Sequence, residues 1–207
     1  MLTLENNNHV CIAHYNDSLD WVNNLNLPFT IISRQHTEEN VWPNVGRKAS
    51  VYLKFIINNY DNLWGVTYFI GDTPKKPYFN MTVWETINSI VADKDILPGY
   101  YSITDEPPIK LTDQNLISKF DMCKGFIEYA INRRINYNEF NGKIHNHFFL
   151  TKNFILTYPK SFYIELQEGL KKKCEDMIKN PDKYGVKNPS VLLEQLFDYS
   201  WQFIFNV

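Results

Sequence analysis

Three short runs of β-branched and aromatic residues divide the first half of the chain, and longer polar or amphipathic stretches separate them. The runs are HVCIAHY at 9–15, PFTIIS at 28–33 and GVTYFI at 65–70. Strands that alternate with crossover helices on a parallel sheet produce this pattern, and HNHFFLTK at 145–152 is a later strand candidate. The sequence therefore predicts an α/β, Rossmann-like fold with a mostly parallel central sheet flanked by helices.

Helical periodicity accounts for much of the remaining chain. Apolar residues between Val45 and Asn62 follow the 3.6-residue period most closely. Further helices are predicted at about 17–25, 83–91, 113–132 and 161–179, and a last one begins at Pro189 and forms a long C-terminal helical segment. The stretch Ala92 to Asp113 is predicted to be a long loop, which either covers a functional site or is an insertion.

Length and charge limit the number of domains and the class of partner. No internal repeat or flexible linker divides the 207 residues, so residues 1–207 are expected to form a single domain. A formal charge of -2 argues against a nucleic-acid partner or an anionic membrane surface. No apolar run reaches the roughly 18 to 20 residues that cross a bilayer, and the N-terminal residues lack signal-peptide features. A soluble chain without a transmembrane segment is expected.

The cysteines indicate a compartment. Cys11, Cys123 and Cys174 are odd in number and widely spaced, and no CxxC pair occurs. This usage excludes a disulfide framework and a cysteine-based zinc site. It favours a reducing compartment, and we expect a cytoplasmic protein.

Candidate binding residues follow the predicted strands, because ligands of parallel α/β sheets bind at the carboxyl ends of the strands. Tyr15, Asn16 and Asp17 follow the first strand and offer an aromatic ring, an amide and a carboxylate, which could hold a base and a ribose. The alternative is that Asn16 and Asp17 only cap the next helix.

A second candidate is the segment Asn44-Val45-Gly46-Arg47-Lys48 at the start of a predicted helix. Cations in the first helical turn oppose the helix dipole and cost a few tenths of a kcal/mol each, unless an anion or an acidic group lies beside them. Free backbone N–H groups, a glycine and a guanidinium are suited to a phosphate. A salt bridge from Arg47 to a carboxylate of the same chain is the equally weighted alternative.

The sequence favours a site without a metal. Asp72 follows the third strand alone, and the paired DxD that would hold a divalent ion against a diphosphate is absent. Asp72 could still bind a metal or a sugar hydroxyl, although a turn role is more common. His145 and His147 share one face of a strand and form the other possible metal site, but no third ligand lies in register.

One carboxylate interrupts the last predicted helix. Val191, Phe197 and Trp201 lie on the same side of this helix as Glu194, so this glutamate is expected to be largely buried. Desolvation would suit it to act as a general base. The alternative is a structural ion pair with an arginine such as Arg47 or Arg34.

Four segments together carry a family resemblance: VCIAHYNDSLDWVNNL, VWPNVGRKASVYLKFIINNYDNLWGVTYFIGD, FFLTKNFILTYPKSFYIEL and LLEQLFDYSWQFIF. Their order and spacing resemble the uncharacterised DUF3431 family over nearly the whole chain. The sequence departs from that family at Lys48, where an acidic residue is usual, and at Ile70-Gly71, where Gln-Gly is usual.

The pattern of that family is in turn similar to nucleotide-sugar glycosyltransferases of the GT-A type, in particular their metal-independent branch. This resemblance implies that a basic side chain stabilises the leaving diphosphate and that a glutamate deprotonates the acceptor hydroxyl. Arg47 and Glu194 are the catalytic candidates for these roles, and the donor-binding candidates are Tyr15, Asn16, Asp17, Asn44, Gly46, Arg47 and Asp72.

Two hypotheses follow. The first is a glycosyltransferase-like enzyme that moves a sugar from a nucleoside diphosphate donor to a hydroxyl acceptor without a metal, with Asn16, Asp17, Asn44 and Arg47 around one cleft. The second is a non-catalytic nucleotide-, sugar- or protein-binding module of the same fold.

Overall fold

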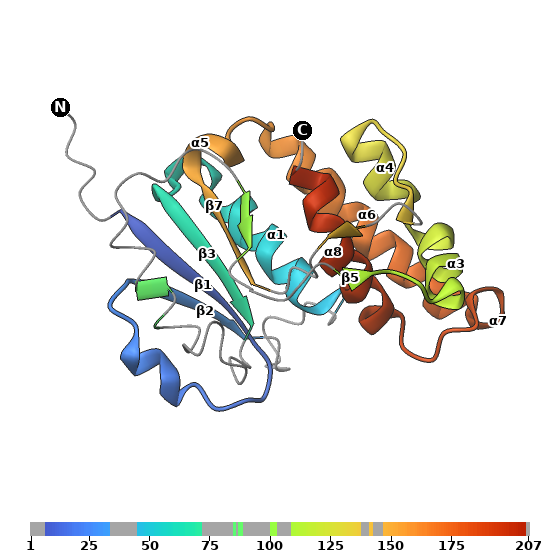
Figure 1. Ribbon diagram of the computed structural model, residues 1–207, viewed down its shortest axis with the longest axis horizontal. Helices are drawn as coiled ribbons and strands as arrows, with labels where there is room; N and C mark the ends of the chain where they lie inside the picture. Colours follow the sequence, from blue (N-terminus) through green and yellow to red (C-terminus); the bar gives the residue numbers. More distant parts are fainter. Residues whose placement is uncertain are drawn as a thin grey trace.

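The computed structural model describes residues 7–33, 45–71, 85, 87–88, 100–102, 109–137, 141–142 and 147–205 (Figure 1). The strands are β1 (Asn8–His14), β2 (Phe29–Ser33), β3 (Val66–Gly71), β4 (Tyr100–Ser102), β5 (Ile109–Lys110), β6 (Asn141–Gly142) and β7 (Phe148–Thr151). The α-helices are α1 (Arg47–Asn59), α3 (Gln114–Cys123), α4 (Gly125–Ile131), α5 (Lys152–Ile155), α6 (Lys160–Lys179), α7 (Pro181–Tyr184) and α8 (Pro189–Phe205). Two short 3-10 helices are η1 (Asp20–Asn24) and η2 (Tyr60–Asn62).

The central sheet has the strand order β2-β1-β3-β7-β4. β1 pairs in parallel with both β2 and β3, while β7 runs antiparallel to β3 and to β4. The predicted α/β class is confirmed, and the prediction of a mostly parallel sheet is confirmed in part. The sheet is mixed: β2, β1, β3 and β4 run in one direction, and β7 runs against its neighbours β3 and β4. A mostly apolar run such as Phe148–Thr151 indicates that a strand is buried, but it does not indicate in which direction the strand runs.

The two faces of the sheet carry different helices. Cys11 and Ala13 of β1 pack in the same core cluster as α1, whereas Val10 and Ile12 point to the opposite face and pack with Trp21 of η1. This alternation is the two-residue period of a strand. Both faces are covered, which explains why β1 and β3 are continuous apolar runs.

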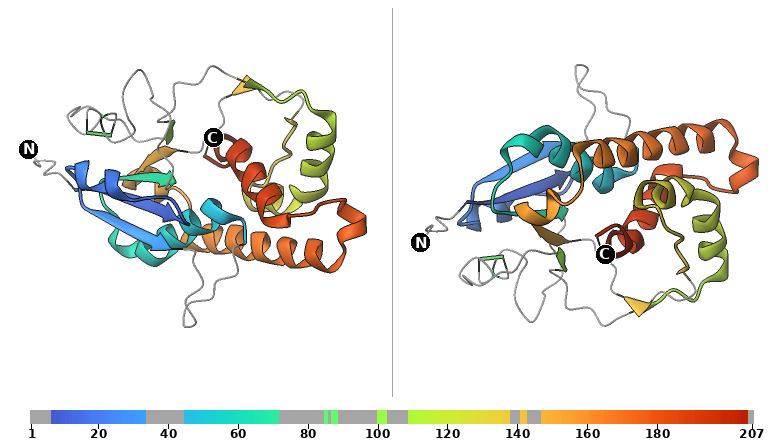
Figure 2. Two further views of the ribbon diagram at one scale, coloured as in Figure 1. Left: turned by 90° about the horizontal axis from the view of Figure 1, so that it is seen from below. Right: turned by 90° about the horizontal axis from the view of Figure 1, so that it is seen from above.

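The helical part lies beside the sheet. Figure 2 shows α6 running from the strands to the far end of the molecule, where α3, α4 and α7 gather, with α8 between them. α1 packs against both α6 and α8, and α8 also contacts α3. Trp201 of α8 is fully buried and contacts Phe148 of β7 and Phe197 of its own helix, so α8 joins the helical part to the sheet.

Local sequence signals locate most element ends. As predicted, α6 ends at Lys179 and α8 begins at Pro189. The Asp113 carboxylate accepts hydrogen bonds from Asn115 N at 2.9 Å and Leu116 N at 3.2 Å, which confirms it as the cap of α3. The helix predicted at 113–132 is interrupted at Lys124 and forms α3 and α4.

Two predictions need correction. The helix predicted at 17–25 is only the five-residue 3-10 helix η1. The predicted loop Ala92 to Asp113 contains the strands β4 and β5. The sequence did not predict them, because strands of two or three residues leave too weak a periodic signal. The rest of that loop and most of the helix predicted at 83–91 lie outside the described residues. Within the described ranges, none of the helices is both long enough and apolar enough to pass through a bilayer.

Candidate functional site

The N-terminus of α1 begins with a left-handed turn. Gly46 precedes the helix with φ +66°, and Arg47 also has a positive φ of 47°. A Cβ on Gly46 would lie 2.6 Å from the side chain of Leu170 on α6, so only glycine fits both the backbone and the contact. The observed role of Gly46 is therefore to let α1 start in close contact with α6.

Two cations in this first turn meet two carboxylates of α8. Arg47 Nη1 lies 3.0 Å from Glu194 Oε2, and Lys48 Nζ lies 3.6 Å from Glu194 Oε1. Lys48 Nζ also lies 3.9 Å from Asp198 Oδ2. Glu194 and Asp198 are one helical turn apart, so both face α1 from the same side of α8. We call Arg47, Lys48, Glu194 and Asp198 the charge cluster.

The charge cluster is largely buried but has one open side. The side chains of Glu194 and Asp198 are 9% and 12% exposed, whereas that of Arg47 is 33% exposed. Arg47 and Lys48, whose charges are unfavourable at a helix N-terminus, are thus compensated by carboxylates of the same chain. This is the salt-bridge alternative of the sequence analysis, and the buried position expected for Glu194 is observed.

The charge cluster lies at the carboxyl end of β3. A Cβ on Gly71, the last residue of that strand, would be 3.0 Å from Lys48 Cδ, so the lysine stem passes directly over the strand end. The Gly71 N–H donates a hydrogen bond of 3.2 Å to Nδ1 of His147. The backbone of β3, the residue before β7 and the first turn of α1 therefore meet at one point.

The carboxyl end of β1 is adjacent, since Ala13 pairs with Gly71 across the two strands. From β1 the chain crosses one face of the sheet through η1 to β2, and then returns through α1 on the opposite face to β3. This reversal between β1 and β3 is a topological switch point, the place where open α/β sheets bind ligands outside the carboxyl ends of their strands. The charge cluster occupies this switch point.

Burial gives two groups of the site unusual proton affinities. Burial, reinforced by the Lys48 charge, lowers the pKa of His147 to about 3, and this histidine is neutral at physiological pH. Burial raises the pKa of Asp198 to about 7; Lys48 and Arg47 act in the opposite direction, and the nearby Glu194 adds to the increase. Near neutral pH Asp198 is therefore divided between its protonated and ionised forms.

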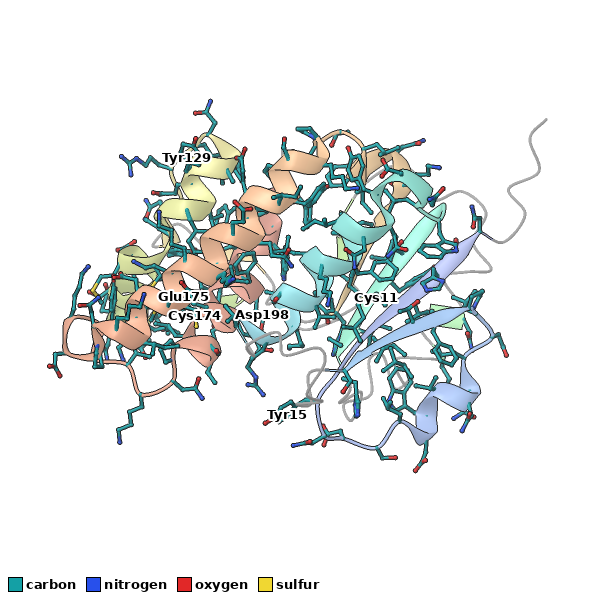
Figure 3. The ribbon with its side chains drawn as sticks, turned by 180° about the vertical axis from the view of Figure 1, so that it is seen from behind. Cys11, Tyr15, Tyr129, Cys174, Glu175 and Asp198 are labelled. Carbon is teal, nitrogen blue, oxygen red and sulfur yellow. The ribbon has the colours of Figure 1, made fainter. Side chains whose placement is uncertain are left out.

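The structure brings some of the predicted site residues together. Arg47 and Glu194 form an ion pair, and Gly46 lies directly before them. Tyr15, Asn16 and Asp17 follow the end of β1 at the same edge of the sheet, with the first two exposed and the third half-buried. In Figure 3 the labelled Tyr15 and Asp198 both lie toward the end of the sheet to which β1 and β3 point.

Other predicted residues fall outside the described part of the chain. These are Asn44, Asp72 and His145. The cleft predicted around Asn16, Asp17, Asn44 and Arg47 therefore stays a prediction. Among the described residues, no group of three or more His, Cys, Asp and Glu side chains is arranged to hold a metal ion. His147 is buried, and its Nδ1 accepts the hydrogen bond from Gly71.

Sequence reasoning missed Asp198 and the role of Lys48. The available signal was the spacing of Glu194 and Asp198, four residues apart in a helix that is otherwise apolar nearly all round. Two acidic residues on one face of such a helix require cations from another element. Arg47 and Lys48, in the first turn of the helix predicted from Val45, are cations of this kind.

Comparisons of the chain with models of protein families, with curated proteins and with solved structures found no match.

Proposed function

We propose that the chain is a glycosyltransferase-like enzyme that transfers a sugar from a nucleoside diphosphate donor to a hydroxyl acceptor. The observation that carries the proposal is the charge cluster at the β1/β3 switch point, where cations and carboxylates from α1 and α8 meet beside Gly71. The resemblance to the DUF3431 family and to GT-A-type enzymes is part of the same proposal.

In this proposal Arg47 stabilises the diphosphate as it leaves. Its guanidinium is one-third exposed, and a planar group with five N–H donors can bind an oxyanion while Nη1 keeps its contact with Glu194. Lys48 lies one residue further along the helix and adds a second positive charge. The N-terminal end of the α1 dipole acts in the same direction.

The donor and acceptor would approach from the carboxyl edge of the sheet. Tyr15, Asn16 and Asp17 are proposed to hold the base and ribose, together with Asn44 and Asp72 from segments that flank α1 and β3. A carboxylate of α8, Glu194 in the assignment made from the sequence, accepts the proton of the acceptor hydroxyl. The free and buried cysteines suit a reducing compartment, and we propose a cytoplasmic reaction.

We also propose that transfer needs no divalent metal, because Arg47 and Lys48 supply the positive charge that a metal would otherwise place at the diphosphate. EDTA is expected to leave the transfer rate unchanged within twofold. A strict requirement for Mn²⁺ or Mg²⁺ would show that the role given to Arg47 is wrong and would return attention to Asp72.

A non-catalytic binding module is the second candidate, and one observation favours it. The two cations and two carboxylates of the charge cluster already balance each other when all four are ionised, so no external anion is needed to neutralise them. Such a module would bind a nucleotide sugar but would not release the nucleoside diphosphate over time.

A thermal-shift screen with UDP-, GDP- and CMP-sugars tests both candidates. At 100 times its Kd a ligand adds about 2.7 kcal/mol to the free energy of unfolding, which is readily measured as a rise in Tm. The rise should disappear in Arg47→Gln. The matched control is Lys160→Gln, since Lys160 is also the first residue of a long helix and pairs with Asp61 at 3.0 Å, remote from the switch point. Release of the nucleoside diphosphate from the bound donor then separates the enzyme from the binding module.

A further inference from the structure

We propose that Asp198, and not Glu194, is the proton acceptor of the site, and that Glu194 is a positioning residue that holds Arg47. The proposal rests on the proposed function and names the group that performs its proton transfer. It follows from the different surroundings of two carboxylates that lie only one turn apart on α8.

Both carboxylate oxygens of Glu194 face cations. Oε2 lies 3.0 Å from Arg47 Nη1, and Oε1 lies 3.6 Å from Lys48 Nζ. Each oxygen of this carboxylate therefore has a cation of α1 beside it. Glu194 is therefore placed to orient the guanidinium, which is the more exposed partner and would otherwise be free to adopt many rotamers.

Asp198 is held much more loosely. Its nearest cation is Lys48 at 3.9 Å, and that lysine is shared with Glu194. Among the hydrogen bonds formed within the described part of the chain, none involves the Asp198 carboxylate. A buried carboxylate without a hydrogen-bond donor is poorly compensated when ionised, so a proton can be accepted there without breaking a hydrogen bond.

The charges that act on Asp198 come from two helices. Lys48 and Arg47 of α1 favour its ionised form, and Glu194 on α8 itself disfavours it. Burial is the largest influence and raises the pKa of Asp198 to about 7. The neighbouring Tyr199 is a phenol whose pKa is raised further by burial, so it remains neutral at the same pH.

His147 is excluded as the alternative proton acceptor. Its Nδ1 already accepts the Gly71 N–H, and burial keeps the pKa of the ring at about 3. Among the described residues of the site, Asp198 is the group whose proton affinity matches neutral pH, which is the condition for efficient general base catalysis.

The proposed step balances as follows. The acceptor hydroxyl gives its proton to the ionised Asp198, and its oxygen forms a bond to the anomeric carbon of the donor sugar. The bond from that carbon to the diphosphate oxygen breaks, and its electron pair leaves with the diphosphate. Arg47 and Lys48 stabilise the added negative charge on the leaving group. The protonated Asp198 then returns its proton to solvent.

Two matched amide variants, Asp198→Asn and Glu194→Gln, make the same chemical change on neighbouring turns. With a donor from the screen and a hydroxyl acceptor, Asp198→Asn should lower kcat by at least about 100-fold and change the donor Kd by less than about threefold. Glu194→Gln should instead weaken donor binding and raise KM, because Arg47 loses its orientation, and it should keep a pH-dependent kcat. The reverse pattern overturns the assignment.

A second measurement does not depend on any substrate. In protein labelled with ¹³C at the side-chain carboxyls, the signal that disappears in Asp198→Asn should titrate near pH 7, and in Glu194→Gln it should titrate at lower pH, since one negative neighbour is gone. An Asp198 signal that stays ionised from pH 5 to 8 overturns the assignment.

The two proposals fail in different ways. If none of the three donors raises Tm, the proposed function is refuted, and the carboxyl titration alone decides which residue exchanges a proton. If a donor binds and is turned over while Asp198→Asn keeps its kcat, the proposed function stands and the assignment of Asp198 is refuted.

Discussion

The raised pKa of Asp198 makes a quantitative prediction about stability. An unfolded aspartate has its ordinary pKa of 3.8, and the folded value is about 7. Between these values the folded protein binds more protons than the unfolded chain, so the contribution of Asp198 to the free energy of unfolding is fully present below the lower value and falls as pH rises. At 1.36 kcal/mol per pKa unit the total is about 4 kcal/mol, of which about 2 to 3 kcal/mol is lost between pH 5 and pH 8.

The substitution Asp198→Asn removes this dependence, because asparagine does not titrate. Relative to wild type, the variant should gain about 2 to 3 kcal/mol in free energy of unfolding between pH 5 and pH 8. Urea unfolding followed by tryptophan fluorescence at both pH values measures the difference, and the other titrations common to both proteins cancel.

An exposed aspartate provides the control. Asp121 is 49% exposed and pairs with Lys124 at 2.7 Å, so Asp121→Asn should change the free energy of unfolding equally at both pH values. Parallel curves for wild type and Asp198→Asn would refute the reasoning, because they would show that the Asp198 carboxyl does not titrate in this range.

Substitutions at three further positions test the rest of the site. Glu194→Gln should destabilise the fold by about 2 kcal/mol, a value reduced from that of a fully buried ion pair because Arg47 is one-third exposed, as urea unfolding at pH 7 would show. The folded pKa of His147 is lowered, so its protonation favours the unfolded chain and wild type loses stability as pH falls. Between pH 6.5 and 4.5, His147→Asn should therefore lose about 2 kcal/mol less free energy of unfolding than wild type. His147→Leu leaves the Gly71 N–H unpaired and should be destabilised at all pH values. Gly46→Ala should lower the free energy of unfolding by about 2 kcal/mol, through its positive φ and its contact with α6, and unchanged stability would contradict the close packing.

The sequence predicts the elements whose signal is local. The run 65–70 is β3 to within one residue, because a continuous apolar stretch between glycines is typical of a buried strand. The helix predicted from Val45 to Asn62 is α1 followed by η2. Asp113 and Pro189 mark helix starts through backbone chemistry that depends only on neighbouring residues.

The remaining features depend on contacts between distant segments. The direction of β7 depends on the path of the chain through α3, α4 and the following residues, and the four-residue sequence of β7 does not indicate that path. The ion pair of Arg47 with Glu194 was one of two predicted alternatives, since residue types allow it but only the packing of α8 on α1 selects it. The raised pKa of Asp198 depends on burial, which the sequence pattern of α8 indicated for its apolar residues and for Glu194 but not for Asp198.

The charge cluster is a poor means of gaining stability. A buried ion pair adds little to the free energy of unfolding, because desolvation offsets most of the attraction between the charges. Proteins in which apolar residues replace such a pair are often as stable. Asp198 makes the balance worse, since its ionised form is disfavoured by burial and by Glu194 and is compensated only by the shared Lys48 at 3.9 Å and, more weakly, by Arg47. α8 is otherwise apolar nearly all round and would pack against α1 without these groups. Stability therefore does not explain why charges of both signs meet beside Gly71, whereas the proposed reaction, which removes a proton and releases an anion, requires them at one place.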